Sequence, residues 1–179
     1  MQKVVITGHD LTVDQIIAVC REGAEVVLSD ESREKILASR QVVNELVEER
    51  KVVYGITTGF GKFSDVVISQ DECKLLQKNL IITHAVGAGD PFKEDIARGI
   101  LLLRVNSLSN GFSGICLETV ETMIAMLNKG VTPFIPEKGS LGASGDLAPL
   151  SHMVLPMIGL GMAWYKGELL PGAEAREGA

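Results

Sequence analysis

Residues 90–130 read DPFKEDIARGILLLRVNSLSNGFSGICLETVETMIAMLNKG, and two consecutive helix patterns lie within them. The pair Asp90–Pro91 has residue types that favour a helix start, and Gly111 has the type that favours a helix end. Ser113 and Gly130 take the same two roles around the second apolar stretch. This segment therefore predicts two helices joined by a short loop.

Helix signals extend outward from this segment toward the N-terminus. Thr12 and Gln15 have the spacing of a capping box, as do Ser69 and Glu72. The stretches expected to form helices are 12–23, 31–50 and 69–87. Together with the first two, they make five expected helices.

Extended segments are short. The stretch KVVYG (51–55) precedes a loop, VTPFIP (131–136) is restricted by two prolines, and AWYKGELL (163–170) contains Lys166 and Gly167 at a hairpin turn. We expect a mainly α, multihelical fold with short β-hairpins. Its domain should span residues 1–170, with 171–179 as a linker or truncated edge.

Composition narrows the class of protein. The chain has 179 residues, 46% of them hydrophobic and 22% charged, which suits one globular domain with a buried core. A net charge of -6 gives no electrostatic attraction to nucleic acid or to an anionic membrane. No apolar run is long enough to span a bilayer. We therefore expect a soluble, cytoplasmic protein without nucleic-acid or membrane partners.

Metal and nucleotide sites are not expected. The three cysteines and three histidines show no short ligand spacing. The sequence Gly59-Phe60-Gly61 lacks the third glycine of a dinucleotide fingerprint, and no glycine–lysine–hydroxyl motif of a phosphate loop is present.

Chemistry is most plausible in EKGSLGASGDLAPLSH (137–152), which is rich in glycine and hydroxyl groups. One interpretation is structural: a loop that leads into a helix, with Asp146 as its cap and Pro149 in its first turn. The other is chemical. In a tight bend the Gly145 nitrogen can attack the Ala143 carbonyl, and loss of two waters leaves a dehydrated Ser144 in a five-membered ring.

Four stretches resemble the aromatic amino acid ammonia-lyases, in that family's order. They are VYGITTGFGKFSD (53–65), LQKNLIITHAVGAGDPF (76–92), LLLRVNSLSNGFSG (101–114) and GSLGASGDLAPLSH (139–152). The resemblance spans roughly Val53 to Leu170. Thr57 departs from the family's usual Asn, and leaves the neighbouring tyrosine and glycines in place.

The resemblance implies a fold, a cofactor and a reaction. The fold would be the N-terminal, cofactor-bearing helical domain of the ammonia-lyase (fumarase/aspartase-like) type. The cofactor would be a methylidene-imidazolone formed autocatalytically from Ala143, Ser144 and Gly145, without metal or nucleotide. The reaction would be loss of ammonia from L-histidine to give trans-urocanate, as in the histidine-specific members.

Roles for four other residues follow from the same resemblance. Tyr54 would be the base, although it could equally be a half-buried tyrosine at a strand end. His84 would face the substrate ring, or would be a helix histidine satisfied in the core. Gly61 would allow close approach of substrate, and Asp146 would assist ring formation or simply cap a helix.

Length is the main departure, because family enzymes continue through a long helical bundle and share active sites within a homotetramer. We expect residues 1–179 alone to be inactive and their Ala-Ser-Gly segment not to be cyclised. Two alternatives remain open. One is a phenylalanine or tyrosine ammonia-lyase or aminomutase, and the other is a non-catalytic, truncated family member.

Overall fold

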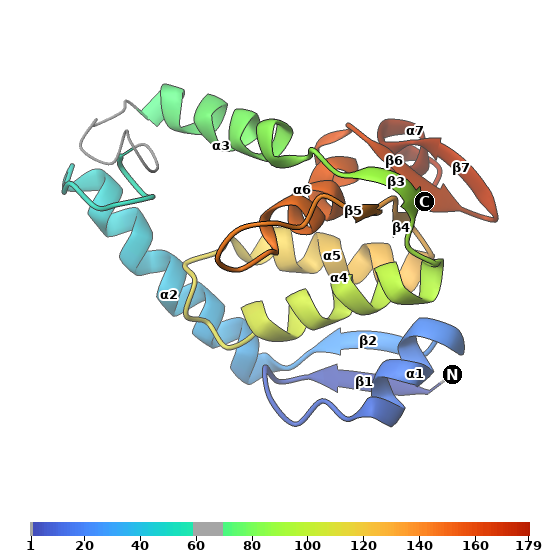
Figure 1. Ribbon diagram of the computed structural model, residues 1–179. Coiled ribbons are helices and arrows are strands. Elements are labelled where there is room, and N and C mark those ends of the chain that lie inside the picture. Colours follow the sequence, from blue (N-terminus) through green and yellow to red (C-terminus); the bar gives the residue numbers. More distant parts are fainter. Residues whose placement is uncertain (1, 59–69) are drawn as a thin grey trace.

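The computed structural model describes residues 2–58 and 70–179, with side chains for 2–58 and 75–179. Helices dominate this part of the chain, which confirms the expected mainly α class (Figure 1). The helices are α1 (Val13–Arg21), α2 (Asp30–Glu48), α3 (Gln70–His84), α4 (Glu94–Leu108), α5 (Leu117–Lys129), α6 (Leu147–Val154), the short 3-10 helix η2 (Leu155–Ile158) and α7 (Gly172–Glu177). The strands are β1 (Lys3–Ile6), β2 (Glu25–Leu28), β3 (Ala88–Pro91), β4 (Thr132–Pro133), β5 (Pro136–Lys138), β6 (Met162–Tyr165) and β7 (Glu168–Pro171).

Helices α4 and α5 form the centre of the molecule. Leu101, Leu102 and Val105 on α4 and Val120 on α5 are fully buried. Burial of each such side chain contributes about 1.5–3 kcal/mol to stability. In Figure 1 the β1, α1 and β2 unit lies on one side of this pair, and α3, α6 and the β6–β7 region lie on the other.

The N-terminal unit contains a parallel strand pair that the sequence analysis did not predict. Strand β1 pairs with β2, and α1 connects them. Val4 and Ile6 of β1 are buried and alternate with exposed residues. The capping box that starts α1 is confirmed, since the Thr12 hydroxyl accepts from the Gln15 amide and the Gln15 side chain accepts from the Thr12 amide at 2.9 Å.

The expected hairpin near the C-terminus is confirmed. Strands β6 and β7 are antiparallel, with Tyr165 opposite Glu168. The two turn residues, Lys166 and Gly167, have φ values of 52° and 82°. Positive φ at both positions is typical of the two-residue turn that matches the twist of paired strands.

The expected start of α4 at Asp90–Pro91 was wrong. These residues belong to β3, which pairs with β5, and the Phe92 amide donates to the Ile135 carbonyl at 2.9 Å. Strand pairing thus keeps the chain extended until Lys93, and the helix begins at Glu94.

The expected start of α5 at Ser113 was also wrong. The Gly114 amide donates to the Ser39 hydroxyl at 2.9 Å, and Arg40 donates to the Gly114 carbonyl at 3.2 Å. These bonds hold the loop against α2, so α5 begins only at Leu117. Its expected end is confirmed, because Gly130 caps it with a φ of 73°.

Two further segments differ from expectation. Residues 51–55, expected to be extended, lead into a turn rather than a strand. Residues 172–177, expected to lie in a linker or edge, form α7. Ala175 is fully buried, and the Tyr165 hydroxyl donates to the Gly178 carbonyl at 2.6 Å, so this segment packs on the hairpin.

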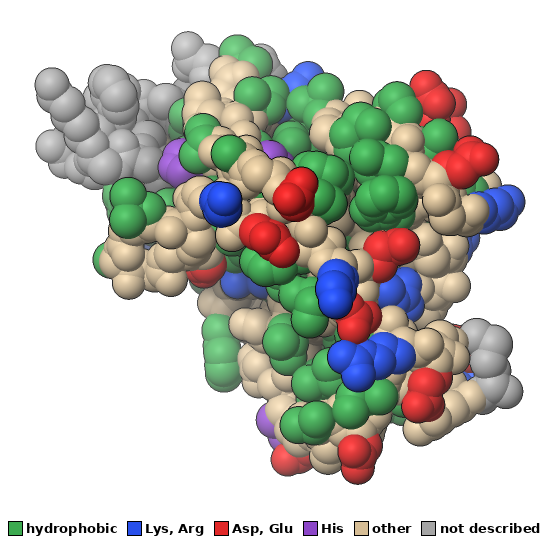
Figure 2. Space-filling view, turned by 45° about the vertical axis from the view of Figure 1, so that its right-hand side comes forward, with side chains coloured by type: hydrophobic (Ala, Val, Ile, Leu, Met, Phe, Trp, Pro, Cys, Tyr) green, Lys and Arg blue, Asp and Glu red, His purple; other side chains and the backbone are tan. Residues whose placement is uncertain are grey.

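None of the described helices is long and apolar enough to cross a membrane. The face shown in Figure 2 has acidic and basic side chains interspersed with hydrophobic ones. The start signal expected at Ser69 lies outside the described residues, although α3 itself is present and begins at Gln70.

Candidate active site

The Ala-Ser-Gly segment lies in the loop between β5 and α6. Ala143 and Ser144 are exposed, and Gly145 is half-buried with a φ of 73°. A Cβ atom at Gly145 would lie 2.9 Å from the Ser140 hydroxyl oxygen. Only glycine therefore combines this left-handed backbone with the close approach of Ser140.

Two side chains close this loop on itself. The Ser140 hydroxyl donates to the Gly145 carbonyl, and the Ser144 hydroxyl donates to the Asp146 carboxylate. Asp146 occupies the residue before α6, but its side chain makes no capping hydrogen bond. Asp146 thus occupies the expected N-cap position, but its carboxylate accepts from Ser144 rather than from an amide of α6.

His84 is the last residue of α3 and is half-buried. Its Nδ1 lies 2.8 Å from the Leu80 carbonyl oxygen and 3.3 Å from the Thr83 hydroxyl. A carbonyl oxygen only accepts, so Nδ1 carries the proton and Nε2 of the neutral ring is an acceptor. Nε2 makes no hydrogen bond to the side chains and backbone described here.

The segment that follows His84 contacts both ends of the Ala-Ser-Gly loop. Ala88 pairs with Lys138 just before the loop, and the Gly87 amide donates to His152 Nε2 at 2.9 Å on the helix just after it. Desolvation of the half-buried His152 ring lowers its pKa from the ordinary 6.5. The segment that follows His84 and the two ends of the loop thus meet at one junction.

Tyr54 lies in the turn that follows α2. Its side chain is 62% exposed, so the half-buried strand-end interpretation was wrong. Thr57 shapes this turn: its hydroxyl accepts from the Val53 amide at 2.9 Å and donates to the Lys51 carbonyl at 2.6 Å. Gly61 lies outside the described residues.

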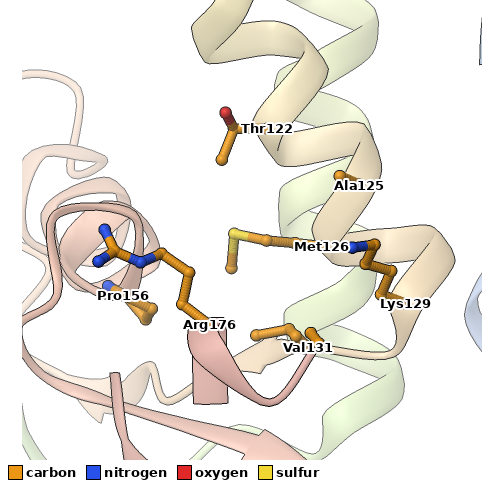
Figure 3. Close-up of a pocket in the computed structure, with 8 residues that line it drawn as sticks. Thr122, Ala125, Met126, Lys129, Val131, Pro156 and Arg176 are labelled. Carbon is orange, nitrogen blue, oxygen red and sulfur yellow. The ribbon is translucent and has the colours of Figure 1, made fainter. Parts of the chain in front are cut away.

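Hollows in the described part of the chain include a small cavity and a larger groove. A cavity of about 100 Å³ lies between α5 and α7, with Met126 extending toward Arg176 (Figure 3). A larger apolar groove of about 600 Å³ lies between α3, α5 and α6. Neither is lined by Tyr54, His84 or Ser144, but Leu147 and Leu150 bring the groove close to the Ala-Ser-Gly loop.

Residues 11–179 match the family described as aromatic amino acid lyase. The chain belongs to the aromatic amino acid lyase family. It is 61% identical over 175 residues to histidine ammonia-lyase of Caldanaerobacter subterraneus subsp. tengcongensis, covering 98% of this chain and 34% of that protein. This aromatic amino acid lyase chain therefore spans about a third of the length of the curated relatives it matches.

Solved structures confirm the fold of this lyase chain. The crystal structure of histidine ammonia-lyase from Trypanosoma cruzi superposes with a TM-score of 0.90 at 39% identity, covering 98% of this chain and 34% of that one. The ergothioneine-degrading enzyme ergothionase from Treponema denticola superposes with a TM-score of 0.94 at 30% identity, covering 99% and 35%.

Three residues of this arrangement were missed by the sequence analysis: Ser140, Gly87 and His152. Ser140 and His152 lie inside the quoted stretch 137–152, but only the folded loop brings Ser140 to Gly145. No local signal connects Gly87 with His152, since they are separated by 65 positions.

Proposed function

We propose that the protein carrying this sequence is a histidine ammonia-lyase, which converts L-histidine to trans-urocanate and ammonia. The observation that carries this proposal is the 61% identity to a curated histidine ammonia-lyase across 98% of the chain. That region includes both His84 and the Ala-Ser-Gly segment.

Ala143, Ser144 and Gly145 fit the requirements of a methylidene-imidazolone. They are consecutive, lie in a bend, and place a glycine at the position where backbone must approach backbone. The Asp146 carboxylate accepts from the Ser144 hydroxyl and would assist ring formation by orienting Ser144 Oγ. Loss of Oγ as water also requires removal of the Ser144 Cα proton and delivery of a proton to Oγ. When formed, the group supplies an electrophile that acidifies the substrate and eases loss of its amine.

His84 recognises the substrate ring. Because its Nδ1 proton is used on the Leu80 carbonyl, Nε2 accepts the N–H of the substrate imidazole. L-phenylalanine has no ring donor for this atom, which would leave Nε2 unpaired beside the bound ring. A site built around a hydrogen bond discriminates strongly against a ligand that lacks the partner.

Tyr54 removes the β-proton of the substrate, a role that follows from the family resemblance, and the residue is exposed. Gly61 lets the substrate approach the backbone closely, by the same resemblance. The enzyme works in the cytoplasm as a homotetramer, in which neighbouring subunits complete the site.

The test uses the natural protein that carries residues 1–179, assayed with L-histidine, L-phenylalanine and L-tyrosine at equal concentrations. Release of ammonia together with urocanate from L-histidine alone is the expected result. Turnover of either other amino acid in preference to histidine would show a different substrate, and no turnover of any of them would favour a non-catalytic member.

A further inference from the structure

Gly87 lies close to two residues from separate segments, Gly139 at the start of the Ala-Ser-Gly loop and His152 on the helix after it. Gly87 follows His84, Gly139 begins the loop, and His152 lies on α6 after it. The Gly87 amide donates to His152 Nε2 at 2.9 Å. One hydrogen bond therefore connects the His84 segment to the helix that ends the loop.

The fit around this bond is close. A Cβ atom at Gly87 would lie 2.9 Å from His152 Nε2 and 3.0 Å from the Pro136 ring. A Cβ atom at Gly139, where φ is 120°, would lie 2.8 Å from the Gly87 Cα. Both glycines thus allow the backbone of the His84 segment to rest between the two ends of the loop.

The bond also fixes the chemical state of His152. Nε2 can accept from an amide only when it is unprotonated, so the neutral ring carries its proton on Nδ1. Partial burial lowers the pKa of His152, which favours this neutral form at pH 7.

We propose that His152 is a positioning residue, which acts through the Gly87 amide to hold His84 in register with the Ala143–Gly145 loop. This inference rests on the proposed function, because it treats His84 and the loop as parts of one site. A misplacement of about 1 Å far from the chemistry can cost an enzyme about 100-fold. The Gly87–His152 bond supplements the pairing of Ala88 with Lys138, so its loss would leave the His84 segment less firmly placed against the loop.

The variants are chosen to separate positioning from folding. His152→Phe keeps a planar ring but has no acceptor, whereas His152→Gln keeps an acceptor oxygen at similar reach. His9→Phe is the matched control, because His9 is exposed and lies near Asp10, away from this junction.

The first measurement is amide hydrogen exchange, by mass spectrometry, of the peptide covering residues 85–91 in the natural protein. We expect one additional fast-exchanging amide in His152→Phe and none in His152→Gln or His9→Phe. Unchanged exchange in His152→Phe would overturn the inference. If His152→Phe does not fold, the test rests on His152→Gln. The 85–91 peptide of that variant must keep the slowly exchanging amide seen in the wild type, and fast exchange of that amide would overturn the inference.

The second measurement is the steady-state kinetics of urocanate formation. A displaced His84 binds the substrate ring less tightly. We therefore expect KM for L-histidine to rise about tenfold in His152→Phe and to lie within about threefold of the wild-type value in His152→Gln. A fall in kcat with KM unchanged would mean only fewer folded molecules and would contradict positioning. A wild-type protein that makes no urocanate would instead overturn the proposed function, while the exchange result would still report on the contact.

Discussion

The three histidines have different surroundings, which determine which ring nitrogen of each has a partner. His9 is exposed, with its Nε2 3.6 Å from the Asp10 carboxylate. His84 uses Nδ1 on the Leu80 carbonyl of its own helix. His152 uses Nε2 on the Gly87 amide. The ring nitrogen that remains available therefore differs between the two: it is Nε2 in His84 and Nδ1 in His152.

Replacing His84 by leucine removes the acceptor for the substrate N–H while keeping an apolar side chain of moderate size. We expect kcat/KM for L-histidine to fall by roughly 10- to 100-fold, equivalent to about 1–3 kcal/mol, since one hydrogen bond to the ring is lost. The preference for L-histidine over L-phenylalanine should narrow by a similar factor. His9→Leu is the control, and an unchanged preference in His84→Leu would remove His84 from substrate recognition.

Stability should depend on pH through His152. Burial lowers its pKa in the folded protein below the ordinary 6.5, so the unfolded chain binds this proton more readily. The contribution of neutral His152 is complete above about pH 6.5 and is lost as pH falls through the lower folded-state pKa. Denaturant unfolding between pH 7.5 and 5 should show wild type losing stability relative to His152→Gln. A difference between them that is constant with pH would show that His152 is not held in its neutral form.

At the scale of the elements, a half-buried arginine connects three helices. One guanidinium nitrogen of Arg98, on α4, donates to the Val19 carbonyl of α1 at 3.0 Å and to the Leu127 carbonyl of α5 at 3.2 Å. Both carbonyls lie in the last turn of their helices, where the usual i+4 amide is missing, and the Leu127 carbonyl also accepts from the Gly130 amide at 3.4 Å. Desolvation lowers the pKa of Arg98.

Arg98→Met should remove both bonds and leave the Val19 carbonyl without its donor, while the Leu127 carbonyl keeps only its long bond from the Gly130 amide. We expect the free energy of unfolding to fall by about 2–3 kcal/mol, as measured by denaturant titration. Arg21→Met is the control: Arg21 is mostly exposed and pairs with Asp95 at 3.0 Å, so its loss should cost less than about 1 kcal/mol. An equal fall in the free energy of unfolding in the two variants would show that Arg98 does not stabilise the contact between its three helices.

The sequence predicted helix ends better than helix starts. Gly130 ends α5 as expected because a left-handed residue is a local requirement. The starts at Asp90–Pro91 and Ser113 failed because distant partners, β5 and Ser39, hold those residues in other conformations. The β1–β2 pair was missed for the same reason, since pairing between strands is not a local property.

In the candidate site, too, local features could be predicted and long-range contacts could not. The Ala143–Gly145 segment could be predicted from the sequence because its chemistry depends on three consecutive residues. His84 and Tyr54 were named only through the family resemblance. The contact of Gly87 with His152 depends on how α3 and α6 pack, so no pattern along the chain could reveal it.

For the whole molecule, the exposure of the Ala-Ser-Gly loop is the main feature. Ala143 and Ser144 are exposed, and the neighbouring Leu141 is 90% exposed. Strained backbone persists only where the surroundings enforce it. Within the described residues, hydrogen bonds of Ser140 and Asp146 hold this loop, and no packed layer covers Leu141.

We therefore predict that an isolated chain of residues 1–179 keeps Ala143, Ser144 and Gly145 as ordinary amino acids. The intact mass should equal that calculated from the sequence, with no deficit of two water molecules. The natural protein that carries these residues is the comparison and should show the deficit. A cyclised isolated chain would mean that the loop and its two internal hydrogen bonds are sufficient for ring formation.

The central claim is that Ser144 becomes part of the group that removes ammonia from L-histidine. The most direct measurement is the rate of ammonia release from L-histidine by the natural protein and its Ser144→Ala variant, with the exposed Ser113→Ala as control. We predict a loss of at least about 1000-fold in Ser144→Ala, since the electrophile cannot form, and a rate near wild type in Ser113→Ala. A Ser144→Ala rate within tenfold of wild type would contradict the account.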